Sequence, residues 1–196
     1  MGAGQIEFAS EASNPVVTFT EEPDRGSPYI APFAPTPQEV VDRMLELAEV
    51  SQSDLVYDLG SGDGRIVITA ARRYGARAVG FEIDPLLVTH SQRRIKEAGL
   101  EDLAEIREQD IRTVDLSPAS VVTIYLYPRA NLRLRAAIIQ QLKPGSRVVS
   151  HFFGMDEWKP DRLEQLTDSA GLFRTVYLWR ISDNEYSPKC SQDNVG

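Results

Sequence analysis

The sequence has 196 residues, enough for one well-filled core and too few for two ordinary domains. Its net charge of −8 repels phosphate backbones, so we expect no nucleic-acid partner, whereas cationic, lysine-rich protein segments would be attracted. The single cysteine, Cys190, can form no intrachain disulfide, and with His90 and His151 it makes no metal-ligand spacing. We see no signal peptide and no apolar run long enough for a membrane span, which predicts a cytoplasmic protein.

Composition divides the chain into three parts. Residues 1–27 are rich in Glu, Ser, Asn and Pro and predict a flexible arm, although residues 16–20 have the pattern of an edge strand. Residues 28–182 carry regular apolar patterns and predict one domain. Residues 183–196 are polar and predict a loose tail.

Helix and strand patterns alternate through the domain. Thr36-Pro37-Gln38-Glu39 reads as a capping box with Pro at the first helical position. Further helices are predicted at residues 65–74, from 84 to 98 and after 127, and strands at residues 55–59, 76–82, 104–107, 120–127, 146–152, 162–167 and 173–181. The last two strands have only a tight turn between them. The pattern predicts an α/β, Rossmann-like, seven-stranded and mostly parallel sheet with a C-terminal antiparallel hairpin and helices on both faces.

A glycine-rich loop, Asp58-Leu59-Gly60-Ser61-Gly62-Asp63-Gly64, follows the first strand and precedes a helix, as a nucleotide-cofactor loop does. Gly60 and Gly62 let the backbone approach a ligand closely. A dinucleotide fingerprint would place its third glycine where this chain has Arg65. The loop alone is equally compatible with a plain strand-to-helix turn, so its surroundings must decide what it binds.

Carboxylates follow the successive strands. Asp58 and Asp63 flank the loop, Glu82 ends the second strand and Asp110 follows the third. So many carboxylates would repel a pyrophosphate but suit S-adenosylmethionine (SAM), which carries an ammonium and a sulfonium. Glu82 stands about 20 residues beyond the loop, where an acid can bind ribose hydroxyls, and Asp110 is placed to accept from an adenine amino group. Each acid alone is also compatible with a helix cap or a solvated loop charge.

Through this loop and Glu82 the sequence resembles class I SAM-dependent methyltransferases. It is also similar to a small protein-lysine methyltransferase family, through Pro35-Thr36-Pro37, residues 57–66, Val121-Val122-Thr123 and residues 144–151. That family includes an archaeal broad-specificity enzyme and mitochondrial enzymes that act on the adenine nucleotide translocase and on ATP synthase. Two positions depart from the family pattern, since Phe33 stands where the family has Tyr and Ser61 where Cys is common.

The resemblance implies that SAM is the cofactor, that no metal is needed, and which residues form the site. The residues it implies for cofactor binding are Thr36, Asp58, Gly60, Ser61, Gly62, Glu82, Ile83, Asp110 and Ile111. Tyr125 and His151 would face the acceptor as catalytic residues, with His151 as the one candidate base in the neutral range. Helix capping is the alternative role for Thr36, and aromatic packing the alternative for Tyr125, Tyr127 and His151.

The resemblance implies transfer of methyl groups to lysine side chains of proteins. The chain has no large lid or second domain to enclose a small substrate, which also favours a protein surface as the acceptor. A small-molecule N- or O-methyltransferase and a SAM-binding protein without catalysis are the alternatives, because fold does not decide substrate.

Overall fold

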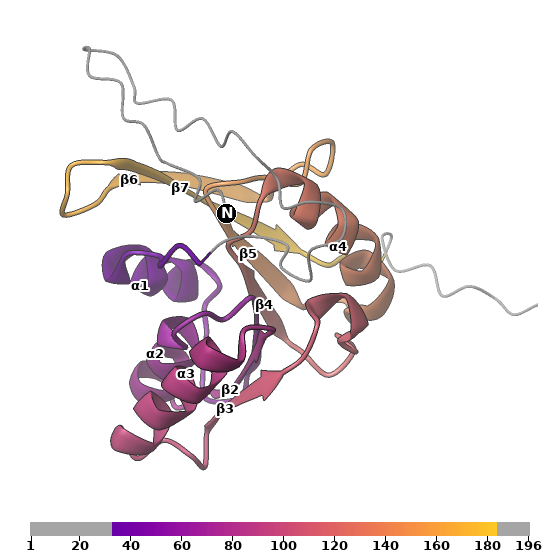
Figure 1. Ribbon diagram of the computed structural model, residues 1–196. Coiled ribbons are helices and arrows are strands. Elements are labelled where there is room, and N and C mark those ends of the chain that lie inside the picture. The colour runs from indigo at the N-terminus through magenta and orange to yellow at the C-terminus, as the bar shows by residue number, and fades with distance from the viewer. Residues whose placement is uncertain (1–32, 184–196) are drawn as a thin grey trace, which may run out of the picture.

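A computed structural model describes residues 33–183 of the chain (Figure 1). The predicted arm, with its edge-strand pattern at residues 16–20, and the predicted tail beyond Asp183 lie outside the described residues. The described part holds a sheet of seven strands in the order β3-β2-β1-β4-β5-β7-β6. Its strands are β1 (Leu55–Leu59), β2 (Arg77–Glu82), β3 (Ala104–Glu108), β4 (Val121–Ile124), β5 (Arg147–His151), β6 (Arg162–Thr167) and β7 (Phe173–Arg180).

The sheet confirms the predicted α/β architecture. Strands β1 to β5 pair in parallel, whereas β7 is antiparallel to both β5 and β6. The helices are α1 (Gln38–Leu47), α2 (Arg65–Tyr74), α3 (Pro85–Glu97), the short 3₁₀ helix η1 (Ile111–Thr113) and α4 (Pro128–Gln141). The carboxyl ends of β1, β2, β4 and β5 therefore meet at one edge of the sheet, where ligands of such folds bind.

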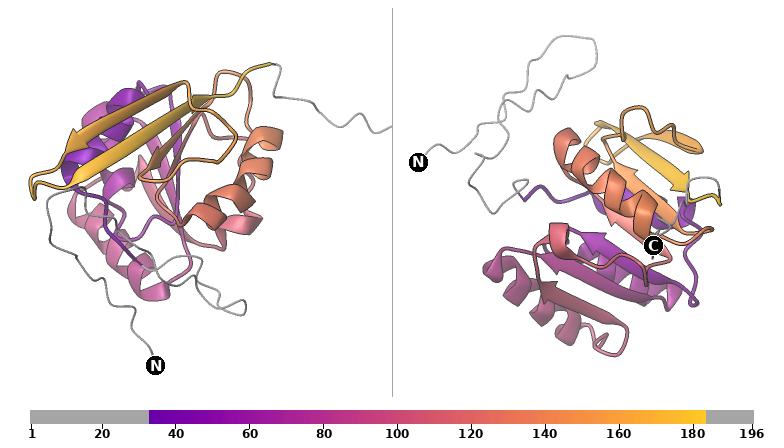
Figure 2. Two further views of the ribbon diagram at one scale, coloured as in Figure 1. Left: turned by 90° about the horizontal axis from the view of Figure 1, so that it is seen from above. Right: turned by 90° about the vertical axis from the view of Figure 1, so that its right-hand side faces the viewer.

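The sheet lies between two helical layers (Figures 1 and 2). Helices α1, α2 and α3 cover one face of the sheet, and α4 covers the other. Successive strand residues point to opposite faces, so each central strand packs against both helical layers. Fully buried valines pack on both sides, with Val56, Val121 and Val149 toward α1–α3 and Val122 and Val148 toward α4. Each such side chain stabilises the fold by about 1.5–3 kcal/mol, so the central strands hold the site edge rigidly.

The start of α1 differs from the predicted capping box. The helix begins at Gln38 after Pro37, and no side chain caps it. The Thr36 hydroxyl lies 3.2 Å from His151 Nδ1 instead, and the Glu39 carboxylate accepts from the backbone N–H of Ser169 at 2.6 Å. Thr36 therefore contacts β5, and Glu39 contacts the turn between β6 and β7. These tertiary contacts replace the local cap.

Strand β4 is shorter than predicted. It ends at Ile124 and not at residue 127, because Pro128 opens α4 and Tyr127 is the capping residue before it. Tyr125 and Tyr127 therefore lie in the connection beyond the strand. Among residues 33–183, no helix has both the length and the apolar character needed to cross a membrane.

Candidate active site

The glycine loop lies directly beyond the carboxyl end of β1. The backbone N–H groups of Gly60 and Ser61 both donate to the carbonyl of Phe81 on β2, at 2.9 and 3.0 Å. Gly60 and Gly62 have φ values of +81° and +53°, in the left-handed region that glycine adopts freely. A Cβ atom on Gly62 would lie 2.5 Å from the Phe33 ring, so only glycine fits beneath that ring.

Gly80 of β2, which the sequence pattern did not single out, leaves room for Ser61 of the glycine loop. A Cβ on Gly80 of β2 would lie 2.6 Å from both the Cβ and the hydroxyl of Ser61. The Ser61 hydroxyl is buried and has no hydrogen-bond partner among the described residues. A buried hydroxyl of this kind is costly unless it meets a ligand or water, which makes Ser61 a fitting contact for a cofactor.

The Glu82 carboxylate is buried at the end of β2 and already accepts three backbone hydrogen bonds. Its Oε2 accepts from Gly62 N–H at 2.8 Å, and its Oε1 accepts from the N–H groups of Ile83 and Asp84 at 2.8 and 3.0 Å. Glu82 therefore shapes the glycine loop itself, a role that the sequence pattern did not reveal. A carboxylate has about four acceptor positions, so capacity remains for a ribose hydroxyl.

Asp58, at the end of β1, is buried and accepts a hydrogen bond from the Thr123 hydroxyl on β4 at 2.7 Å. Burial, together with the nearby carboxylates of Glu82 and Asp63, raises the pKa of Asp58 to about 7, although the hydrogen bond from Thr123 works to lower it. A ligand ammonium beside Asp58 would relieve this cost by stabilising the charged form. The position thus suits the cationic end of SAM.

The other two carboxylates of the predicted acidic set are paired with arginines. Asp63 accepts from Arg65 at 2.7 Å and from Arg94 at 2.8 Å. Burial works to raise the pKa of Asp63, but these two guanidinium groups hold it below its ordinary value. Asp110 pairs with Arg112 and caps η1 by accepting from the Arg112 N–H at 2.9 Å. The acidic set is therefore partly neutralised, and within it only Asp58 and Glu82 have no arginine partner among residues 33–183.

Ile83 and Ile111, both expected as cofactor contacts, lie at the ends of neighbouring strands. Ile83 follows β2, and its N–H is one of the donors to Glu82. Ile111 opens η1, is buried, and lines a mostly apolar cavity of about 80 Å³ between η1 and α4. The sheet order sets β3 beside β2, so the two residues follow neighbouring strands at the carboxyl edge of the sheet.

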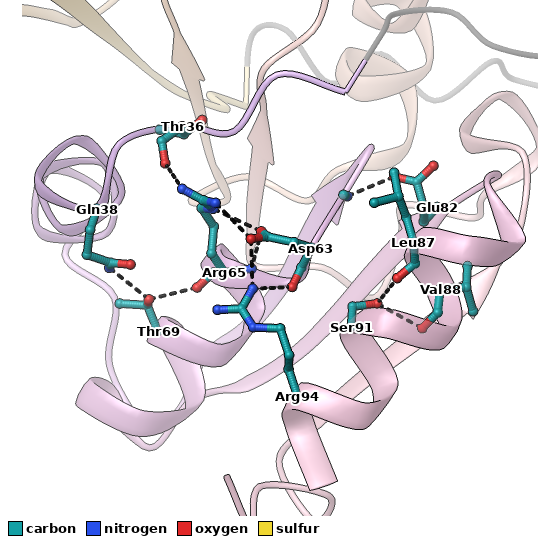
Figure 3. A network of polar contacts seen from close by, with 11 residues as sticks. Thr36, Gln38, Asp63, Arg65, Thr69, Glu82, Leu87, Val88, Ser91 and Arg94 are labelled. Carbon is teal, nitrogen blue, oxygen red and sulfur yellow. Dashed lines mark hydrogen bonds and ion pairs between the residues drawn. The ribbon is translucent and has the colours of Figure 1, made fainter. Parts of the chain in front are cut away.

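Arg65 links the glycine loop to the segment that carries Thr36 (Figure 3). Arg65 donates to the Thr36 carbonyl at 2.7 Å while its other N–H groups bind the Asp63 carboxylate. The Thr36 hydroxyl in turn lies 3.2 Å from His151 Nδ1 at the end of β5. Arg65 occupies the position where a dinucleotide fingerprint would have its third glycine. The sequence pattern indicated only that this glycine is absent, whereas the structure shows that Arg65 connects two segments.

Tyr125 and His151 come together in space as expected, with ring centroids 4.1 Å apart. His151 is fully buried, and burial together with the charge of Arg174 lowers its pKa to about 3. The prediction that His151 titrates in the neutral range is wrong, since the ring stays uncharged there and is a weak base. Burial raises the pKa of the Tyr125 phenol, so its hydroxyl keeps its proton at physiological pH.

The arrangement can hold SAM and position an acceptor. A glycine cradle, two carboxylates that have no arginine partner within the described part of the chain, and a buried hydroxyl that has no hydrogen-bond partner there fit a ligand with ammonium and ribose groups. Tyr125 follows β4, and His151 ends β5 beside it. In the described part of the chain, no group of His, Cys, Asp and Glu residues is arranged to bind a metal ion.

Comparison with known proteins identifies the family. The model of the ANTKMT methyltransferase domain matches residues 58–162. The chain is 43% identical over 155 residues to a protein-lysine N-methyltransferase of Saccharolobus islandicus, a match that covers 79% of this chain and 96% of that protein. It is 34% identical over 132 residues to a Homo sapiens lysine N-methyltransferase that is named for ATP synthase, covering 67% of this chain and 56% of the human protein.

A solved structure is similar as well. It belongs to a Salinibacter ruber protein described as an RNA methyltransferase and contains S-adenosyl-L-homocysteine; it is 53% identical, has a TM-score of 0.72, and the match covers 80% of this chain and 97% of that one. The resemblance stated from the sequence is thereby confirmed. The chain belongs to the ANTKMT methyltransferase domain family.

Proposed function

We propose that this chain is a SAM-dependent methyltransferase that modifies lysine side chains of proteins. The observation that carries the proposal is the 43% identity to a protein-lysine N-methyltransferase along 96% of that relative. The geometry supports it, because the site offers a cradle for a cationic cofactor beside a tyrosine-lined acceptor edge.

For the cofactor, we propose contacts from the residues that border the loop: Thr36, Asp58, Gly60, Ser61, Gly62, Glu82, Ile83, Asp110 and Ile111. Asp58 would bind the ammonium group and Glu82 a ribose hydroxyl. Asp110 would accept from the adenine amino group in exchange for part of its ion pair with Arg112, which is exposed and therefore weak.

The bound cofactor supplies a methyl group on sulfonium, which is already activated for in-line displacement. The chain's own residues then position the acceptor and exclude water. A lysine must lose its proton first, and neither Tyr125 nor His151 has a pKa suited to taking it near neutral pH. We propose that the Tyr125 hydroxyl orients an amine that arrives neutral, with the proton released to water.

RNA is the second candidate acceptor, because the Salinibacter ruber relative is described as an RNA methyltransferase. The net charge of −8 argues against it, since binding RNA relies on neutralising phosphates. We therefore propose a protein acceptor and no nucleic-acid partner. The cytoplasmic location predicted from the sequence is likewise a proposal, which cell fractionation tests.

The purified chain is incubated with isotope-labelled SAM and one class of acceptor at a time. The three classes are a panel of lysine-containing proteins, total RNA and small amines. We expect label in proteins, mapped to lysine by mass spectrometry, and none in RNA. Glu82→Ala serves as the control for contaminating activity. Label in RNA or a small molecule alone would overturn the lysine proposal, and SAM binding without any transfer would point to a binding protein.

A further inference from the structure

The end of β5 contains a strained turn that the proposed mechanism does not use. Phe152 has a φ of +69°, a left-handed conformation that bulky residues rarely adopt. The Phe153 N–H donates to the His151 carbonyl at 2.8 Å, which closes a three-residue turn around Phe152. Strain of this kind persists only where the surroundings impose it, and it is concentrated at functional sites.

Two buried polar side chains impose the turn from the α4 side. The Ser150 hydroxyl donates to the Phe153 carbonyl at 2.6 Å, and the Asn131 amide donates to the same carbonyl and to the Ser150 hydroxyl, both at 3.3 Å. Asn131 and Ser150 are each 0% exposed. The opposite amide orientation would set the Asn131 oxygen against carbonyl oxygens, so the network fixes the side chain as it stands.

Asn131 makes these bonds at a cost. Its side-chain oxygen is buried and has no hydrogen-bond partner among the described residues. An apolar side chain in α4 would avoid that cost, whereas the amide supplies two donors to the turn. The burial of an incompletely satisfied amide next to a strained turn indicates that the position of the turn matters.

The turn presents aromatic rings at the acceptor edge. The Phe152 ring stands perpendicular to the His151 ring with centroids 6.1 Å apart, and the His151 ring contacts that of Tyr125. The Phe153 ring lies 5.0 Å from that of Phe152. These rings adjoin the tyrosine that we place at the acceptor. Aromatic faces pack well against the aliphatic stem of lysine.

We propose that Phe152 forms a wall of the lysine acceptor channel, and that Asn131 is a positioning residue which holds Phe152 there through the turn. This inference rests on the proposed lysine methylation and deepens it by naming a binding residue and its support. Phe152 contacts the acceptor, whereas Asn131 acts only through the turn.

The test uses three single variants and one double variant in the full chain. Phe152→Gly removes the ring and relieves the strain, and the relief offsets part of the lost ring packing, so we expect the variant to fold. Asn131→Ala removes the amide, and a double variant combines the two changes. Glu49→Gly is the matched control, because Glu49 is also strained, with a φ of +53°, but follows α1 at the opposite edge of the sheet.

For each variant, steady-state kinetics give kcat and KM for a lysine acceptor of the wild type, and calorimetry gives the affinity for S-adenosylhomocysteine. We expect Phe152→Gly and Asn131→Ala each to lower kcat/KM for the acceptor on the order of tenfold to a hundredfold. Cofactor affinity should stay within about twofold of the wild type. The double variant should lose no more than Phe152→Gly alone, since Asn131 acts through Phe152. Glu49→Gly should match the wild type.

The possible failures are distinguishable. If the wild type is active and Phe152→Gly leaves its acceptor kinetics unchanged, Phe152 does not line the acceptor channel. If the losses in kcat/KM multiply in the double variant, Asn131 does not act through Phe152. Should Asn131→Ala fail to fold, Ser150→Ala takes its place, because the Ser150 hydroxyl bonds the same carbonyl. A wild type that methylates no lysine overturns the proposed function and the inference together.

Discussion

The Asp58 carboxyl makes cofactor binding sensitive to pH. Burial raises its pKa to about 7, so near neutral pH the ligand-free protein is a mixture of protonated and charged forms. A ligand ammonium prefers the carboxylate. Affinity for S-adenosylhomocysteine should therefore be full above that pKa and weaken as pH falls through it, with a slope approaching tenfold per pH unit.

Calorimetry from about pH 6 to about pH 8 tests this, and proton release on binding should accompany the change. Asp58→Asn should bind more weakly at the upper end of this range and lose the pH dependence, because the amide does not titrate. If Asp58→Asn keeps the wild-type pH dependence, another group is responsible and Asp58 does not contact the ammonium.

Glu82 has two roles, so removing its carboxylate should change two quantities, the cofactor affinity and the free energy of unfolding. Glu82→Ala removes a proposed ribose contact and also leaves the N–H groups of Gly62, Ile83 and Asp84 without their acceptor. We expect cofactor affinity to fall about tenfold or more, and the free energy of unfolding to fall by about 1–3 kcal/mol for each buried donor left unpaired. Glu108→Ala is the matched control, because the Glu108 side chain is exposed at the end of β3, and it should change neither quantity.

At the scale of elements, Arg65 joins the start of α2 to the segment before α1. Its guanidinium holds both Asp63 oxygens and the Thr36 carbonyl, a forked geometry that a lysine cannot reproduce. Arg65→Lys should lower the free energy of unfolding by about 1.5–3 kcal/mol and weaken cofactor binding, because the loop loses its anchor.

Chemical denaturation with a matched surface arginine checks this prediction. Arg93 pairs with Glu97 on the exposed side of α3, so Arg93→Lys should change the free energy of unfolding by less than about 0.5 kcal/mol. Equal effects of the two substitutions would mean that Arg65 is only a surface charge.

The elements also show what the sequence could predict. Seven strands and the helices between them follow from apolar periodicity, because burial on one or both faces leaves a regular pattern. The capping box at Thr36 is wrong, since the Thr36 hydroxyl has a partner on β5, 115 residues away, and no local pattern encodes that contact. The pairing of Asp63 with Arg94 and the role of Asn131 are missed for the same reason.

At the scale of the molecule, we propose that the sheet joins a half that binds the cofactor to a half that receives the acceptor. Strands β1, β2 and β3 with α2 and α3 carry the glycine loop, Asp58 and Glu82, whereas β4, β5 and α4 carry Tyr125, His151 and the Phe152 turn. The two halves meet between β1 and β4, where Thr123 bonds Asp58. The Thr36 hydroxyl, 3.2 Å from His151 Nδ1, is a second contact between the two halves.

This division predicts how turnover depends on pH. Neither Tyr125 nor His151 in the acceptor half has a neutral pKa, so the neutral fraction of the lysine should set the rate. With a reference lysine pKa near 10.4, the rate at subsaturating acceptor and saturating cofactor should climb from about pH 7 toward about pH 9, approaching about tenfold per unit. Saturating cofactor separates this rise from the titration of Asp58.

Tyr125→Phe, measured in the same assay, distinguishes orientation from packing. If the hydroxyl orients the amine, the variant should lose turnover on the order of tenfold while S-adenosylhomocysteine affinity stays unchanged, and its rate should still rise with pH because the lysine still titrates. A packing role predicts almost no change, since the ring remains beside His151. A rate that falls above neutral pH in a folded, cofactor-saturated wild type would contradict the scheme, because it would require an acid that loses its proton near neutral pH, which neither Tyr125 nor His151 does.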